Sequence, residues 1–402
     1  MGAATLLMAG FYGAQLSFGV FMIPVLEEFG WTRSITSGAM STVAGIAGIL
    51  GIMAGRFSDK YGARILIAIG ALFSGSGYLL LSRINSIWEL YIYFGLFTGI
   101  CLASCWSPVN ATVSRWFVKK RVLAVGIAIS GITIGQILVP PLAAHFIADY
   151  GWRFSFTLLA FIVWGTAIPA IIILGRNAPA HAAFPDSGST AIDKLDIKYS
   201  TPVPLQEWST VRIAKTTPFW TVMVAGFVTA AGFYLVVVHV VAYATDMGIS
   251  ATSAALILTF TGIGNISGRI LAWPITIKIG SRIALLLLLA LQAIALFAFM
   301  WSSSLWIFTI LAIIFGVGLG AVTTLRVSMV SEHFGIKSVG KILGLSSISW
   351  AAGGITGPIL AGYIFDLMHS YDVAFIIGGT IMTLGMIVVY LLKGSDSTIV
   401  AQ

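Results

Sequence analysis

The stretch TGIGNISGRILAWPITIKIGSR, residues 261–282, decides how this chain folds. It continues an apolar run that begins near Ala251, and the run is long enough to cross a bilayer as a helix. Arg269 lies well inside that helix, and Asn265 precedes it by one turn on the same face. A charged side chain costs several kcal/mol in hydrocarbon. Such a residue therefore normally faces a bundle interior or a water-filled cavity and has a function there.

Two interpretations of Arg269 follow from its position. The sequence offers no nearby intramembrane carboxylate to neutralise it, so the simplest partner is an anion from outside the protein. The alternative is an arginine that snorkels to the cytoplasmic headgroups, because Lys278 and Arg282 mark a membrane interface only a few turns later.

Composition predicts the same class of protein. The chain is 58% hydrophobic and 9% charged, with a mean hydropathy of +0.99, whereas a soluble domain carries about 25% charged residues. The net charge of +8 comes from basic residues in short loops beside apolar runs, which is a topology signal and not a nucleic-acid patch. Cys101 and Cys105, one turn apart in an apolar helix, are expected to pack as small hydrophobes. We therefore expect an all-α polytopic membrane protein.

Apolar runs of about 20 residues recur along the whole chain and predict twelve transmembrane helices. The only long polar segment contains five prolines and charges of both signs, which is typical of a linker. We expect an N-terminal six-helix bundle at 1–175, a cytoplasmic linker at 176–218 and a C-terminal six-helix bundle at 219–402. The expected spans are 3–26, 34–54, 65–82, 87–113, 122–146, 154–175, 219–244, 251–273, 283–301, 305–329, 343–367 and 373–392.

The basic residues predict the orientation. If the N-terminus is cytoplasmic, cytoplasmic segments hold 17 of the 22 lysines and arginines, and the opposite side holds only Arg33, Arg83 and Arg153. This asymmetry is a strong positive-inside signal. It predicts a multi-pass protein of a bacterial-type cytoplasmic (inner) membrane, with both termini in the cytoplasm.

The two halves repeat. Several residues of the first half recur in the second at nearly constant offsets of 217 to 219 positions. Such offsets indicate a duplicated six-helix unit, and a duplicated unit in a membrane protein predicts a substrate site near the midplane, between the halves. The pairs are Gly30 and Gly248, Lys60 and Lys278, Gly62 and Gly280, Arg64 and Arg282, Phe117 and Phe334, Pro141 and Pro358, and Phe156 and Phe375.

The loop between spans two and three reads GRFSDKYGAR, residues 55–64, and resembles the loop motif of the major facilitator superfamily. The resemblance covers all twelve spans and implies that superfamily's fold of two pseudo-symmetric six-helix bundles. An aspartate in this loop can accept hydrogen bonds at a helix N-terminus while the basic residues anchor to headgroups, which would latch one conformation. A purely structural turn is the alternative. The matching residues are Gly55, Asp59, Lys60, Gly62 and Arg64, and in the second copy Trp273 and Ile277 replace the glycine and the aspartate.

Three further segments resemble the monocarboxylate transporters and their bacterial relatives, which include oxalate:formate exchangers. In that family the arginine of span eight holds the substrate carboxylate, and Arg269 occupies the matching place. A planar guanidinium pairs a carboxylate through two parallel hydrogen bonds, which a lysine cannot reproduce. The segments are SFGVFMIPVLEEFGWTRSITSGA at 17–39, SRWFVKKRVLAVGIAISG at 114–131 and VHVVAYATDMGIS at 238–250.

Two positions depart from the family pattern. Proton-coupled members place an aspartate four residues before the arginine, where this chain has Asn265, as in the exchanger pattern. The exchanger's second cation, a lysine in span eleven, is replaced here by Gly353. The family's proton-coupling scheme therefore does not transfer directly to this chain.

A second intramembrane cation, Arg326, lies in span ten. It is expected to face the cavity and form a two-arginine site with Arg269, to snorkel, or to brace the cytoplasmic side by pairing with Glu332. If both arginines met one cavity unpaired, a dianion would be a reasonable substrate.

His239 in span seven is the only histidine placed well within a span, and histidine ordinarily titrates near neutral pH. It is the candidate for carrying the coupling proton that Asn265 cannot carry. The alternative is a neutral histidine hydrogen-bonded to a neighbouring hydroxyl such as that of Tyr243, one turn later.

Further polar side chains occur in spans that line the cavity in the superfamily. Tyr12 and Gln15 lie in span one, Asn110 in span four, Tyr234 in span seven and Trp350 in span eleven. We expect them to contribute to substrate binding, although such residues also serve as contacts between helices.

These observations predict a secondary active transporter of small organic anions that works by alternating access. Monocarboxylates such as lactate or pyruvate, coupled to a proton, are the first expectation, and exchange of dicarboxylates or oxalate-like anions through two arginines is the alternative. The spans contain no nucleophile–base pair and no metal-ligand cluster, so we expect no enzymatic activity, no metal and no cofactor. The expected partners are the anion, a proton or counter-anion and the lipid bilayer, with no nucleic acid and with the monomer as the functional unit.

Overall fold

Long apolar segments fold as helices in a membrane, because lipid offers no hydrogen-bond partners and a helix satisfies its backbone groups internally. The computed structural model describes residues 1–116, 121–174, 210–334 and 336–392. Within these ranges the regular structure is helical, without strands, and twelve helical segments are long and apolar enough to cross a bilayer. The predicted all-α architecture with twelve spans is confirmed.

Two of the first six spans differ from a single α-helix. The first span breaks at Ser17, whose hydroxyl donates to the carbonyl of Gly13 at 2.8 Å. The fourth span contains a π-helical turn, η1. The elements are α1 Gly2–Leu16, α2 Phe18–Phe29, α3 Arg33–Tyr61, α4 Ala63–Leu81, α5 Ile87–Leu90, η1 Tyr91–Leu96, α6 Phe97–Trp116, α7 Arg121–Tyr150 and α8 Trp152–Leu174.

The second half is more regular, with one α-helix for each span. A short helix, α10, precedes the first of them and lies inside the segment predicted as the linker. The elements are α10 Thr210–Ala214, α11 Thr217–Asp246, α12 Ala251–Ile279, α13 Ser281–Phe299, α14 Leu305–Phe334, α15 Ile336–Met368 and α16 Asp372–Leu391.

The repeat in the sequence is also present in the backbone. Gly30 and Gly248, which follow the first and seventh spans, have φ of +65° and +83°. Gly62 and Gly280, in the loops after the second and eighth spans, have φ of +84° and +81°. Glycine adopts such angles without the strain that a Cβ would cause, so the repeated glycines mark equivalent turns in the two halves.

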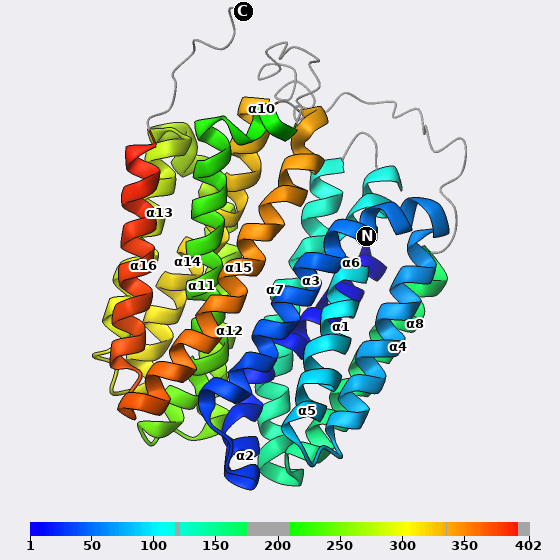
Figure 1. Cartoon of the computed structure of the whole chain (residues 1–402), viewed down its shortest axis with the longest axis vertical. Helices are drawn as coiled ribbons and strands as arrows, with labels where there is room; N and C mark the ends of the chain where they lie inside the picture. Colours follow the sequence, from blue (N-terminus) through cyan, green and yellow to red (C-terminus); the bar gives the residue numbers. More distant parts are fainter. Residues whose placement is uncertain (117–120, 175–209, 335, 393–402) are drawn as a thin grey trace, which may run out of the picture.

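The two ends of the bundle are referred to below by their positions in the chain. The linker end is where α8 stops and α11 begins, at the top of Figure 1 beside α10. The distal end is the opposite one, where α2 and α5 lie at the bottom of Figure 1. Each span runs from one of these ends to the other.

Glycines allow α12 and α14 to pack with their backbones in contact. A Cβ added at Gly264 or Gly268 would overlap the carbonyls of Ile313 or Val317, and one added at Gly320 would overlap the carbonyl of Asn265. Close approach through small residues is how helices associate in a membrane, where apolar burial between helices gives little driving force. This packing fixes the rotation of α12 and therefore the direction in which Arg269 points.

The two halves meet mainly along α3 and α15, which lie side by side in the centre of Figure 1. Ser37 Oγ donates to the carbonyl of Pro358 at 3.0 Å, and Ser41 Oγ donates to that of Ile355 at 2.8 Å. A second interface joins α7 to α12, and α2 also contacts α11. The polar contacts between the halves that we find in the described ranges belong to the distal part of the bundle.

Candidate functional site

Arg269 points back along its own helix toward Asn265. Its Nε donates to Asn265 Oδ1 at 2.9 Å, and Asn265 itself is buried. Side chains on a helix lean toward its N-terminus, which for α12 is the distal end. The guanidinium therefore points away from Lys278 and the headgroups at the linker end, which is not the snorkelling geometry.

The face of α12 that carries Arg269 is turned toward the other half of the protein. Gly262, two helical turns earlier on the same face, packs against Ile137 of α7, and Thr259 Oγ1 donates to the carbonyl of Ile137 at 2.8 Å. Arg269 is half-buried two turns closer to the linker end. It thus lies on the surface between the two bundles, as a substrate site between the halves requires.

Both intramembrane arginines use Nε for a protein contact and leave their Nη nitrogens without one. In the part of the chain that the structure covers, we find no hydrogen bond from the Nη nitrogens of Arg269 or Arg326. The ion pairs among those residues join Arg33 to Asp246, His145 to Asp149 and Arg153 to Glu28. Each guanidinium therefore presents a two-nitrogen fork of the kind that binds a carboxylate bidentately.

Arg326 is buried in a slot between α11 and α15. Its side chain is 7% exposed, its Nε donates to the carbonyl of Val222 at 3.1 Å, and its guanidinium carbon lies 5.7 Å from the centre of the Trp350 ring. Gly226 makes the slot possible, because a Cβ there would overlap the Nη2 nitrogen. The expected alternative pairing with Glu332 does not occur, since that carboxylate accepts from Ser281 instead.

Four of the predicted site residues gather around one tyrosine at the centre of the molecule. The hydroxyl of Tyr234 interacts with the Gln15 amide and with the Trp350 indole, and Tyr12 lies close enough to Tyr234 to interact electrostatically. Gln15 is fully buried, and its Oε1 has no hydrogen-bond partner among the described residues. Through Trp350 this cluster is continuous with Arg326. The structure thus joins spans one, seven, ten and eleven.

Asn110 approaches the same cluster from α6. Its Nδ2 donates to the carbonyl of Trp106 at 2.8 Å, and the Trp106 ring meets the Tyr12 ring edge-on at 6.5 Å. Its Oδ1 is buried, with no partner found in the described part of the chain. Arg269 and Asn265 stand apart on α12, and no contact that we find joins them to this central cluster.

His239 occupies a different region, at the distal contact between the halves. The expected hydroxyl partner, Tyr243, is wrong: Nδ1 lies 2.9 Å from the hydroxyl of Tyr371, and Nε2 lies 2.9 Å from the carbonyl of Pro358. Tyr243 instead donates to Asp372 at 3.0 Å. A partner 132 residues away cannot be found from helical spacing.

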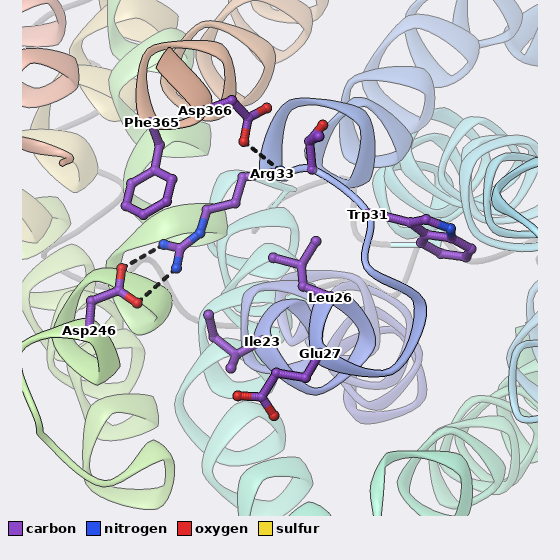
Figure 2. A pocket seen from close by; sticks show the side chains of 9 residues that line it. Ile23, Leu26, Glu27, Trp31, Arg33, Asp246, Phe365 and Asp366 are labelled. Carbon is purple, nitrogen blue, oxygen red and sulfur yellow. Dashed lines mark hydrogen bonds and ion pairs between the residues drawn. The ribbon is translucent and has the colours of Figure 1, made fainter. Parts of the chain in front are cut away.

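An arginine that the sequence marked only as a topology signal closes the distal end. Arg33 donates from Nη1 and Nη2 to the two carboxylate oxygens of Asp246, at 2.6 and 2.8 Å, and from Nη1 to the Tyr371 hydroxyl at 2.8 Å. Asp366 caps the first turn of α3, accepting from the backbone N–H groups of Arg33 and Ser34 at 2.9 Å each and from the Ser34 hydroxyl. These contacts, shown in part in Figure 2, all join the N-terminal half to the C-terminal half.

A hollow of about 330 Å³ lies on the distal surface beside this contact. Arg33, Asp246, Phe365, Asp366 and Glu27 contribute to its lining (Figure 2). It is far from Arg269 and from the Tyr234 cluster, and both carboxylates facing Arg33 are already engaged. We therefore assign it to the closure between the halves and not to the substrate site.

The loop motif lies at the linker end. Gly62 has the positive φ that its turn requires, and Lys60 and Arg64 are exposed. Gly55 and Asp59 belong to α3, but their side-chain surroundings lie outside the described residues. The latch that we predicted for this motif stays a prediction.

Comparison with known proteins agrees with this architecture. A family model described as Major Facilitator Superfamily matches residues 3–275 and 222–399. Monocarboxylate transporter 13 of Rattus norvegicus is 26% identical over 376 residues, covering 93% of this chain and 83% of the relative. Monocarboxylate transporter 4 of Gallus gallus is 25% identical over 399 residues, covering 96% and 80%. A solved bacterial homologue of the human lysosomal transporter Spinster, inward-facing and unoccupied, superposes with a TM-score of 0.73 at 14% identity, covering 97% and 94%.

Proposed function

The chain belongs to the major facilitator superfamily of membrane transporters, and from this premise we propose that it carries small organic anions by alternating access. Its relatives and its fold are those of transporters, not of enzymes. The proposed substrates are monocarboxylates such as lactate or pyruvate, and the proposed coupling ion is a proton. The family resemblance at Arg269 and the names of the relatives support this substrate class.

One observation carries the proposal: Arg269 is held by Asn265 through Nε, while its Nη fork has no partner that we find in the described chain. A half-buried guanidinium without a counter-charge is unfavourable in a membrane protein. A carboxylate supplies the missing charge and two parallel acceptors. Asn265 positions the fork without neutralising it, which an aspartate at this place would do.

The contacts between the halves support a conformation that is closed at the distal end. We propose that the linker end is cytoplasmic, as the basic residues predict, so that this conformation faces the cytoplasm. The substrate then reaches Arg269 from the cytoplasmic side, and opening of the Arg33 contacts exposes the site to the other side. A ligand drives this exchange only if it binds the two conformations with different affinity. We place the monomer in a bacterial-type inner membrane, with both termini cytoplasmic.

Thermal unfolding of the purified chain with a panel of carboxylates tests the proposal. Pyruvate or lactate should stabilise the wild type, and Arg269→Lys should lose the bidentate pair. A charge-assisted hydrogen bond contributes about 1.5–3 kcal/mol, so the affinity should fall about 10- to 150-fold. Arg83→Lys, at an exposed distal position, is the matched control and should bind normally. Near-normal binding and uptake by Arg269→Lys would reject the assignment.

The alternative, exchange of dicarboxylates or oxalate-like anions, has one specific observation in its favour. Arg326 presents a second unpaired fork, and it is joined through Trp350 to the central cluster around Tyr234. Counterflow in anion-loaded vesicles separates the two functions. Exchange that ignores an imposed pH gradient and is lost in Arg326→Lys favours the exchanger, whereas uptake that follows the pH gradient favours proton symport.

A further inference from the structure

A chain of hydrogen bonds leads from the distal surface into the interior of the C-terminal half. It starts at Asp246, passes through the guanidinium of Arg33 to the hydroxyl of Tyr371, and continues to His239 and the carbonyl of Pro358. His239 and Tyr371 are both 0% exposed. Figure 2 shows the surface end of the chain, where Arg33 reaches Asp246.

The positions of the protons along this chain follow from the chemistry of its members. The carbonyl of Pro358 can only accept, so Nε2 of His239 carries a hydrogen. In a neutral imidazole Nδ1 is then an acceptor, and the hydroxyl of Tyr371 donates to it. Burial raises the pKa of the Tyr371 hydroxyl, which therefore keeps its proton. The hydroxyl oxygen is left free to accept from Arg33, so every donor in the chain points in one direction.

A proton added to Nδ1 of His239 breaks this order. Nδ1 becomes a donor aimed at the Tyr371 oxygen, which already accepts from Arg33, and the tyrosine hydroxyl loses its acceptor in a site without exposure. Two positive charges, on Arg33 and His239, then lie on either side of one oxygen, within about 6 Å of each other. Movement of Arg33 away from Tyr371 relieves both problems.

The acidic groups around the chain do not neutralise the imidazole directly. Asp246 of α11 accepts from the Arg33 side chain, Asp366 of α15 caps the start of α3, and Asp372 of α16 accepts from Tyr243. We find no ion pair from His239 to a described carboxylate; its two nitrogens face Tyr371 and Pro358. The added charge therefore acts on Arg33, which carries the contact between the halves.

We propose that His239 is the proton sensor of the distal closure: the neutral imidazole holds Tyr371 and Arg33 in place, and protonation releases Arg33 and opens the distal end. By linkage, the distal-open conformation binds the proton more tightly than the closed one. A proton taken up at the open distal end is released when that end closes. This deepens the proposed function and rests on its proton coupling, with His239 acting through the gate and not through the bound anion.

The distance between the halves at the distal end, measured against pH on the purified full chain, tests the proposal. Spin labels at Asn85→Cys and Ser303→Cys report it, since both positions are exposed distal links in opposite halves. Lowering the pH from about 8 to about 5 should raise the open-to-closed ratio about tenfold or more. His239→Gln, whose amide can donate to Pro358 and accept from Tyr371, should stay closed and lose the pH dependence.

Two further variants keep the test decisive. Tyr371→Phe removes the link and should weaken both the closure and its response to pH. His145→Gln, at an exposed distal histidine within α7, should respond like the wild type. A pH-independent wild type, or an unchanged pH response in folded His239→Gln or Tyr371→Phe, overturns the proposal.

Stabilisation by pyruvate, measured on the same samples, separates this inference from the proposed function. If the gate depends on His239 alone, His239→Gln should still bind pyruvate through Arg269. If pyruvate and the other carboxylates fail to stabilise even the wild type, the proposed function fails, whatever the gate does.

Discussion

The contact between Arg33 and Asp246 offers a direct test of how the distal end is closed. Two hydrogen bonds of 2.6 and 2.8 Å join the guanidinium to the carboxylate, and the side chains are 11% and 31% exposed. Because the pair joins the two halves, it contributes only to conformations in which the distal end is closed. Asp246→Asn keeps one acceptor oxygen but removes the charge and places an amide N–H₂ against the guanidinium.

The size of the effect follows from this geometry. Exposed ion pairs contribute about 0.2–1 kcal/mol, and hydrogen bonds to charged groups contribute about 1.5–3 kcal/mol. A bidentate, partly buried pair lies between these limits, so we expect Asp246→Asn to weaken the closed conformation by about 1–2 kcal/mol. This corresponds to an increase of about 5- to 30-fold in the open-to-closed ratio.

Distance measurements between labels at Asn85→Cys and Ser303→Cys give this ratio directly. Glu28→Gln is the matched control, because Glu28 forms an equally close pair with Arg153 at 2.5 and 2.7 Å within the N-terminal half. It should leave the ratio unchanged. Equal distance distributions for Asp246→Asn and Glu28→Gln would show that the ion pair does not hold the closure, and the same reasoning about Arg33 would then fail.

Two further predictions concern glycines that make room for other groups. Gly226→Ala should displace the Arg326 guanidinium and reduce transport of dicarboxylates at least tenfold, whereas Gly232→Ala on the same helix meets only flexible side-chain ends and should transport normally; equal transport by the two variants would contradict a role for the slot. Gly268→Ala should lower the stability by about 1–3 kcal/mol in thermal unfolding, because its Cβ would overlap a backbone carbonyl of α14, which cannot move like a side chain. Gly165→Ala, with open space around it, should be neutral, and similar unfolding of both would argue against tight α12–α14 packing.

Much of the candidate site could be read from single residues because their types are unusual for their surroundings. Arg269 and Arg326 are identifiable as charges inside apolar helices, and Tyr12, Gln15, Tyr234 and Trp350 as polar or aromatic groups in spans near the centre. Their grouping was not predictable in the same way. The sequence suggested a pair of arginines, whereas the structure joins Arg326 to the tyrosine cluster and leaves Arg269 on a separate face.

The distal closure had no signal in the sequence. Arg33 counted only as one basic residue on the sparsely charged side, and its partner Asp246 lies 213 positions away. His239 was recognisable as a titratable group, but Tyr243, the partner expected from helical spacing, proved wrong, and the hydroxyl it meets belongs to Tyr371. A functional assignment built on the nearest hydroxyl in the chain would have placed the proton in the wrong network.

By itself the sequence determined the twelve spans, the duplication of the six-helix unit and the turns at Gly30, Gly62, Gly248 and Gly280. Membrane thickness, hydrophobicity and backbone angle act on short segments, so local sequence is enough to specify these features. Only the tertiary structure decided which side chains from distant spans meet. Partners across helices depend on the rotation and register of each helix, and these are set by the close packing of small residues such as Gly264, Gly268 and Gly320 and not by any period within one span.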